Sequence, residues 1–302
     1  MSLAINFSTN RISQYISLTK PRVNLLIVFC ALIGMLMALL DNSYVDSYSP
    51  MKLFLALVGI GLVSSAAAAV NCLVEQSIDR KMARTAWRPL PSGTLTKKQT
   101  IIFSLILSIL GFWLLIEFVN NYTAFLTLAT FAGYAFVYTI LLKPLTPQNI
   151  VIGGASGAMP PVLGWAAVNG TTPPEAWILF LIIFVWTPPH FWALALYRVD
   201  DYKRSGLPML PVTHGSKFTR LQILLYTVLL VATSTLPFLI GMSGLFYLLF
   251  SVIFGLIFLY SAWKLYQEYS EKQSKQVFKY SINYLILIFF TLILDKIIIV
   301  FT

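Results

Sequence analysis

Nine long apolar runs divide this sequence, and they constrain its fold more strongly than any other feature. A run of about 18 or more apolar residues is long enough to cross the hydrocarbon core of a bilayer as a helix. The runs cover approximately residues 23–41, 53–74, 100–118, 122–142, 150–168, 175–196, 221–240, 243–263 and 281–301. Because 58% of the 302 residues are hydrophobic and only 11% are charged, we predict an all-α polytopic membrane protein. Its nine transmembrane helices are expected to form one domain over residues 1–302.

Lysine and arginine fall almost entirely on one side of this predicted topology. If the N-terminus is cytoplasmic, every cation except Lys52 and Lys296 lies in a cytoplasmic segment. Cytoplasmic loops of membrane proteins are enriched in these residues, so we predict an inside N-terminus, an outside C-terminus and a bacterial inner membrane. The net charge of +10 then follows from topology and contact with anionic membrane lipid, and it gives no reason to invoke nucleic acid.

Polar side chains recur every fourth residue at the inner end of the second span, at Asn71, Glu75 and Asp79. This spacing places them on one face of a helix, about 6 Å apart along its axis. Mg²⁺ favours oxygen ligands and usually combines one or two carboxylates with substrate phosphates, so the pattern suits a metal diphosphate. The alternative is that both carboxylates only form ion pairs with cations of the following loop.

A second acidic pair, Asp200 and Asp201, follows the sixth span on the same predicted face of the membrane. Two carboxylate clusters beside many cations are typical of a site that holds a polyanion through metal ions and direct ion pairs. The candidate cations are Arg84, Arg88, Lys143, Lys203 and Arg204.

Two histidines and several aromatic residues are further candidates. His190 follows Pro188-Pro189 in the sixth span, seven residues before Tyr197, and its imidazole suits iron ligation or proton transfer. A buried histidine that bonds to a neighbouring helix is the other interpretation, and His214 is expected at the surface. The proline pairs at 160–161 and 188–189 are predicted to kink the fifth and sixth spans. Aromatic candidates for cation stabilisation, each also explained by ordinary packing, are Tyr134, Tyr138, Trp165, Trp186, Phe191 and Trp192.

These motifs resemble the UbiA superfamily of intramembrane prenyltransferases, whose first acidic motif is similar to N-x-x-x-D-x-x-x-D. Asn71, Glu75 and Asp79 match it, with glutamate in place of the commoner aspartate. The resemblance is to the branch of the superfamily that modifies haem. It rests on the segments 18–23, 79–85, 88–93, 146–154, 159–165, 186–194 and 208–211.

The resemblance implies a nine-helix fold and a transferase reaction. In that reaction farnesyl diphosphate alkylates a vinyl group of protohaem IX, water captures the product cation, and the modified haem serves haem-copper oxidases, whose assembly proteins are possible partners. The implied Mg²⁺ ligands are Glu75, Asp79, Asp200 and Asp201, with Asn71 beside them. The implied substrate contacts are Arg84, Arg88, Lys143, His190, Tyr197, Lys203 and Arg204.

Three other functions stay open at this point. One is a prenyltransferase of the same superfamily that uses a quinone precursor or another aromatic acceptor. Another is a transporter, because kinked spans and intramembrane polar residues also suit permeation, although a transporter has no need for two acidic clusters on one face. The third is a purely structural membrane subunit.

Overall fold

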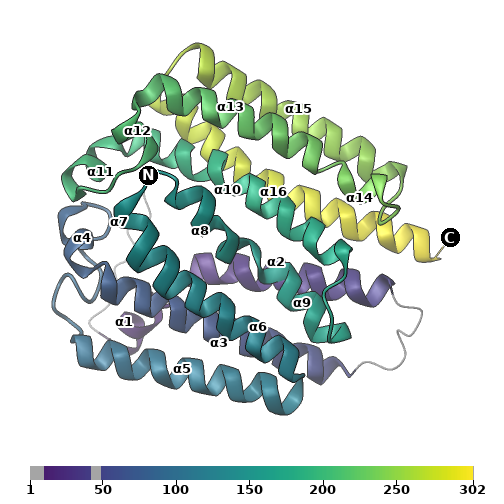
Figure 1. Ribbon diagram of the computed structural model, residues 1–302, viewed down its shortest axis with the longest axis horizontal. Coiled ribbons are helices and arrows are strands. Elements are labelled where there is room, and N and C mark those ends of the chain that lie inside the picture. The colour runs from purple at the N-terminus through teal and green to yellow at the C-terminus, as the bar shows by residue number, and fades with distance from the viewer. Residues whose placement is uncertain (1–9, 42–48, 302) are drawn as a thin grey trace.

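The computed structural model describes residues 10–41 and 49–301, and these residues form a bundle of long helices (Figure 1). Within those ranges, nine helical segments are long and apolar enough to cross a membrane, which confirms the predicted spans. The segments are α2 (Pro21–Asp41), α3 (Pro50–Val74), α5 (Lys97–Phe118), α6 (Asn121–Ala132) with η2 (Gly133–Leu142) and α7 (Lys143–Leu145), α8 (Asn149–Ala158) with α9 (Pro160–Asn169), α10 (Pro174–Tyr197), α13 (Gly215–Thr233) with α14 (Leu236–Leu239), α15 (Leu245–Gln267), and α16 (Glu271–Phe301).

The short helices lie in the connections. They are α1 (Arg11–Leu18), α4 (Gln76–Lys81), α11 (Val199–Ser205) and α12 (Leu210–Thr213). In Figure 1, α4, α11 and α12 all lie at the end of the bundle opposite the C-terminus. Both long loops that carry the acidic motifs therefore belong to the same end.

Two predicted boundaries are wrong, because helices continue beyond their apolar stretches. The seventh span begins at Gly215 rather than at 221, and the ninth begins at Glu271 rather than at 281. A prediction based on apolar runs misses the polar first turns of a helix, although the helical backbone hydrogen bonds continue through them. Lys272, Lys275 and Lys279, which the apolar runs leave in a loop, accordingly lie on the first turns of α16.

Six elements form a closed ring of neighbours. α2 packs on α3, α3 on η2, η2 on α8, α8 on α10, α10 on α16, and α16 back on α2. α5 covers α3 from outside, while α13 and α15 cover α10 and α16. Large apolar side chains such as Ile109, Trp113 and Leu249 stay exposed on these outer helices, as expected of surfaces that face lipid. The polar motifs lie at one end of this ring of helices.

The two proline pairs have different effects. Pro160 separates α8 from α9, so the fifth span is interrupted as predicted. The sixth span is one helix, α10, with Pro188 and Pro189 inside it. The two prolines have no N–H to donate to the preceding turn. Just before them, the hydroxyl of Thr187 donates to the carbonyl of Ile183, one turn earlier, at 2.8 Å.

α2 and α9 touch backbone to backbone, through Gly34 and Gly164. A Cβ atom at Gly164 would overlap the carbonyl oxygen of Ala31, and one at Gly34 would overlap the carbonyl oxygen of Pro161. Small residues allow such close approach between helices in lipid, where packing replaces the hydrophobic effect. This contact fixes α9 against the ring.

Gly164→Ala is therefore expected to destabilise the protein, by about 3 kcal/mol, because rigid backbone must move to admit the methyl group. Thermal unfolding of the detergent-solubilised protein measures the change. Gly157→Ala is the matched control, since no atom lies within 4 Å of a Cβ at that position. Equal unfolding temperatures for the two variants would contradict the close-packing argument.

Candidate active site

The first acidic motif lies where α3 passes into α4. The N–H of Glu75 donates to the carbonyl of Asn71 at 3.0 Å, and the N–H of Asp79 donates to the carbonyl of Glu75 at 2.8 Å. Helical bonding therefore continues across the junction, and the three side chains follow one another at successive turns. All three are buried, with 1%, 5% and 2% of Asn71, Glu75 and Asp79 exposed. This is the arrangement that the four-residue spacing predicts.

Glu75 is the centre of a network between three elements. Its Oε1 accepts from Nζ of Lys143 at 2.5 Å and from Nδ2 of Asn71 at 2.6 Å. Burial by itself would raise the pKa of Glu75, but Lys143 and Lys20 outweigh burial and lower this pKa to about 2. The carboxylate is therefore fully ionised at neutral pH.

The π-helix η2 brings Lys143 to this network. The N–H of Lys143 bonds to the carbonyl of Tyr138, five residues earlier, and the hydroxyl of Thr139 bonds to the carbonyl of Tyr134 at 2.8 Å. Thr139 also accepts from Nδ2 of Asn71 at 3.1 Å. Wider helical turns of this kind frequently occur at functional sites, because they re-aim side chains.

Lys20 is a site residue that the sequence analysis did not select. Its ammonium donates to Oδ1 of Asn71. Its φ of 49° lies in the left-handed region, which is unfavourable for a residue with a Cβ, and its neighbour Pro21 restricts it further. Burial lowers the pKa of Lys20, while Glu75 opposes that change. A strained backbone conformation persists only where the surrounding structure enforces it, and such positions are often functional.

Asp79 pairs with Arg88 from the loop after α4. Oδ2 of Asp79 and Nη1 of Arg88 are 2.8 Å apart, and this contact raises the pKa of Arg88 against the effect of burial. Gln76 and Arg80 fix the loop, by donating to the carbonyls of Leu90 at 3.0 Å and Pro91 at 3.2 Å. The loop thus places a cation directly on the motif.

The second acidic motif belongs to α11, which packs against α4. Asp201 is buried, and its carboxylate is 2.5 Å from Nη2 of Arg204 and 3.9 Å from Nη1 of Arg198. Asp200 and Lys203 are exposed.

Arg84 connects the two acidic segments. Nη2 of Arg84, which follows α4, donates to the hydroxyl of Tyr202 in α11 at 3.3 Å, and its guanidinium lies 5.7 Å from the centre of the tyrosine ring. The two motifs are therefore neighbours at one end of the bundle, as the sequence predicts.

The four carboxylates of the two motifs do not form a metal site made of protein ligands alone. Among residues 10–41 and 49–301, no group of three or more His, Cys, Asp or Glu side chains is placed to hold a metal ion. A divalent cation here needs oxygens from a ligand, which is how Mg²⁺ is usually bound beside a diphosphate.

His190 lies deeper in the bundle, between α10 and α16. Its Nδ1 is 2.7 Å from the hydroxyl of Ser281, whose carbonyl accepts from the indole N–H of Trp186 at 2.7 Å. The imidazole stacks between the rings of Trp186 and Phe278, with centroids 4.3 and 4.6 Å away. His190 is therefore a buried histidine bonded to a neighbouring helix, which is one of the two interpretations of the sequence. Ser281 bonds only Nδ1, so this bond does not use Nε2. His214 is exposed and contacts Thr213.

The other aromatic candidates lie in three places. Tyr134 and Tyr138 lie near the first acidic motif, with ring centroids 5.4 Å apart and Nζ of Lys143 5.8 Å from the ring of Tyr138. Trp165 and Trp192 are fully buried in the core. Tyr197 lies at the C-terminal end of α10, with Nζ of Lys275 5.5 Å from its ring.

Comparison with known proteins identifies the family. The model of the UbiA prenyltransferase family matches residues 27–292. A protoheme IX farnesyltransferase of Burkholderia thailandensis is 59% identical over 287 residues, which cover 95% of this chain and 94% of that protein. A second protein of that name, from Paraburkholderia xenovorans, is 59% identical over 286 residues, or 95% of this chain and 93% of its own.

Solved structures share the fold at low sequence identity. A structure described as a study of digeranylgeranylglyceryl phosphate synthase superposes with a TM-score of 0.75 at 23% identity, over 95% of this chain and 98% of that one. A UbiA homolog from Archaeoglobus fulgidus bound to DMAPP and Mg²⁺ gives a TM-score of 0.64 at 14% identity, over 92% and 99% of the two chains. The expectation from the motifs is confirmed: this membrane protein, with nine candidate spans among its described residues, belongs to the UbiA prenyltransferase family.

Proposed function

We propose that this protein transfers the farnesyl group of farnesyl diphosphate to a vinyl group of protohaem IX, giving haem O and diphosphate. The observation that carries the proposal is the buried column of Asn71, Glu75 and Asp79, to which Lys20, Arg88 and Lys143 are bonded. The name of relatives that are 59% identical over 95% of the chain supports this choice of substrates. A quinone precursor or another aromatic acceptor is the alternative within the family.

The donor half of the reaction needs charge stabilisation at the leaving group. The bond between C1 of the farnesyl group and oxygen breaks, and diphosphate leaves with the electron pair. Lys20, Arg88 and Lys143 are partly buried beside the buried carboxylates, and they hold positive charge where that negative charge develops. Arg84, Lys203 and Arg204 border the same end and are proposed to bind the outer phosphate oxygens.

The donor set fits Mg²⁺ shared with a diphosphate, because the residues offer carboxylates in two separate pairs rather than a closed cage. Glu75 and Asp79 on one side and Asp200 and Asp201 on the other are the proposed ligands. Bound Mg²⁺ neutralises the diphosphate and makes it a better leaving group. The structural relative from Archaeoglobus fulgidus, which was solved with DMAPP and Mg²⁺, supports a divalent metal in this fold.

The acceptor half joins carbon to carbon. The vinyl group of protohaem attacks C1 of the allylic cation, and the new cation beside the porphyrin takes up water, which then loses a proton. Water must not reach the allylic cation first, so this step requires a dry interior. His190 and Tyr197 are proposed to bind the porphyrin, which places the acceptor along α10.

The cellular setting follows from the same proposal. The cation-rich end of the bundle is proposed to face the cytoplasm in a bacterial inner membrane, with the C-terminus outside. Haem O is a haem with an added isoprenoid, so the step that consumes it is proposed to be the assembly of a haem-copper oxidase.

Incubation of the purified protein with protohaem, farnesyl diphosphate and Mg²⁺ tests the proposal. Mass spectrometry of the porphyrin is expected to show the added hydroxyethylfarnesyl group, and diphosphate is released in equal amount. Omission of farnesyl diphosphate is the control. The alternative acceptor would be established if diphosphate were released while the haem stayed unmodified and an added quinone precursor was modified instead.

Lys20→Ala provides a test of the residue that sequence reasoning missed. We expect the KM for farnesyl diphosphate to rise about tenfold, because one partly buried charge-assisted contact is lost from the leaving-group end, with the KM for protohaem unchanged. Steady-state kinetics with each substrate varied in turn measures both constants. Lys81→Ala, an exposed lysine at the end of α4, is the matched control. Equal effects on the two KM values would remove Lys20 from the diphosphate site.

A further inference from the structure

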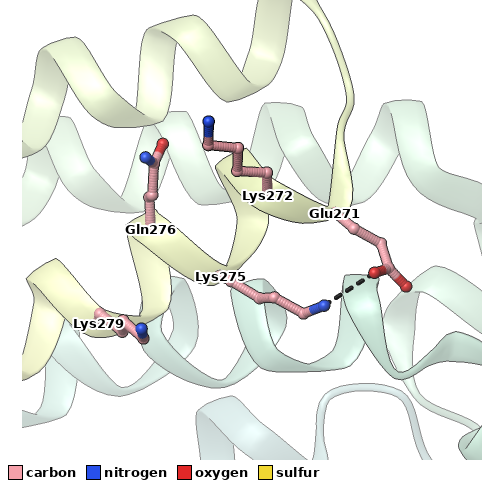
Figure 2. A pocket seen from close by; sticks show the side chains of 5 residues that line it. All are labelled: Glu271, Lys272, Lys275, Gln276 and Lys279. Carbon is pink, nitrogen blue, oxygen red and sulfur yellow. Dashed lines mark hydrogen bonds and ion pairs between the residues drawn. The ribbon is translucent and has the colours of Figure 1, made fainter. Parts of the chain in front are cut away.

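A lysine-lined pocket opens on the first turns of α16. It has a volume of about 530 Å³ and is lined by Glu271, Lys272, Lys275, Gln276 and Lys279 (Figure 2). The three lysines are spaced by three and four residues, which places them on one face of the helix. Glu271 is the single acid among the lining residues, and its carboxylate is 2.8 Å from Nζ of Lys275.

This pocket differs electrostatically from the diphosphate site. There, buried carboxylates already pair with the cations. Here, three lysines line the pocket with a single carboxylate, and neither Lys272 nor Lys279 takes part in an ion pair among the described residues. A pocket with this excess of positive charge suits a dianion that brings no metal with it.

A continuous row of rings leads from the pocket into the bundle. Nζ of Lys275 lies 5.5 Å from the ring of Tyr197, whose centroid is 6.1 Å from that of Phe278. Phe278 stacks in turn on His190 at 4.6 Å. Tyr197 and Phe278 are only half-buried, so this row keeps accessible aromatic surface between the charged pocket and the imidazole.

We infer that the pocket binds the two propionate carboxylates of the porphyrin acceptor, with Lys275 and Lys279 as their main partners. This inference rests on the proposed function and specifies the acceptor's position in it. A porphyrin with both carboxylates at one edge is amphipathic, so its ring favours the apolar interior while the carboxylates stay at the membrane surface. Along α16, Lys275 and Ser281 are six residues apart, a rise of about 9 Å along the helix axis, so the pocket and the partner of His190 lie at different depths of the same helix.

Titration of the purified protein with protohaem, without farnesyl diphosphate or Mg²⁺, tests the inference through the Soret band. The Kd is expected to rise about tenfold in Lys275→Ala/Lys279→Ala, since two carboxylate contacts of modest individual strength are lost. Protohaem dimethyl ester, which has no free carboxylates, is expected to bind the wild type as weakly as protohaem binds this variant. The double variant is expected not to distinguish the two porphyrins.

Two further variants separate the pocket from general effects of charge. Lys275→Arg/Lys279→Arg keeps both cations and is expected to keep the preference for free carboxylates. Lys97→Ala/Lys98→Ala removes two exposed lysines from the first turn of α5, which Figure 1 draws on the other side of the bundle from α16, and is expected to bind like the wild type.

Two outcomes would overturn the inference. One is an alanine double variant that prefers protohaem over its ester as strongly as the wild type does. The other is unchanged haem binding together with weakened binding to vesicles of anionic phospholipid, which would assign the pocket to lipid headgroups. The titration contains no farnesyl donor, so it gives its answer even if the protein fails to make haem O.

Discussion

Glu75→Gln and Asp79→Asn are each expected to lower kcat for farnesyl transfer by on the order of 10³-fold, because each removes a preorganised charge at the centre of a buried site. Each change keeps the size of the side chain and an acceptor oxygen. The bonds to Lys143 and Arg88 can therefore persist while the negative charge disappears. The loss should consequently appear in turnover more than in the amount of folded protein.

Initial rates at saturating substrates, with Mg²⁺ varied, measure this effect. Both variants should require more Mg²⁺ than the wild type if the carboxylates hold the metal with the diphosphate. Glu117→Gln, at an exposed position near the far end of α5, is the matched control and should leave kcat and the Mg²⁺ requirement unchanged. Wild-type rates in either site variant would assign the buried column to structure alone.

The membrane fold could be predicted from the sequence because lipid leaves few solutions. A long apolar stretch must satisfy its backbone polar groups internally, so it becomes a helix whatever surrounds it. The column of Asn71, Glu75 and Asp79 was equally predictable, since four-residue spacing has one meaning on a helix. The extra turns of α16 were not, because Lys272 and Lys275 interrupt the apolar pattern without interrupting the helix.

The contacts of the site were beyond prediction wherever they join distant segments. Lys20 and Asn71 are 51 residues apart in the chain, and no local pattern indicates that they bond. The contact between Glu75 and Lys143 spans 68 residues and depends on the wider turns of η2, which apolar periodicity does not distinguish from an α-helix. Ser281 is a small hydroxyl residue within an apolar helix, and only the packing of α10 on α16 gives it a role beside His190.

His190→Ala is expected to lower kcat/KM for protohaem by about 10²-fold or more, while the KM for farnesyl diphosphate stays unchanged. Ser281 engages Nδ1, so the imidazole is oriented and Nε2 is the nitrogen left for the acceptor. We expect Nε2 to ligate the haem iron, so its removal should also change the optical spectrum of bound ferric haem, which loss of a merely structural residue would not do. Ser281→Ala, which frees the ring without removing it, should give a smaller loss of about tenfold.

Two variants separate the imidazole nitrogen from the packing of the ring. His190→Phe keeps an aromatic ring between Trp186 and Phe278 but has no nitrogen, so it should lose activity and the spectral signature as fully as the alanine variant. His214→Ala removes the other histidine of the chain from an exposed position and should behave like the wild type. If His190→Phe retains activity, then His190 serves packing alone, and the acceptor must bind along a different face of α10.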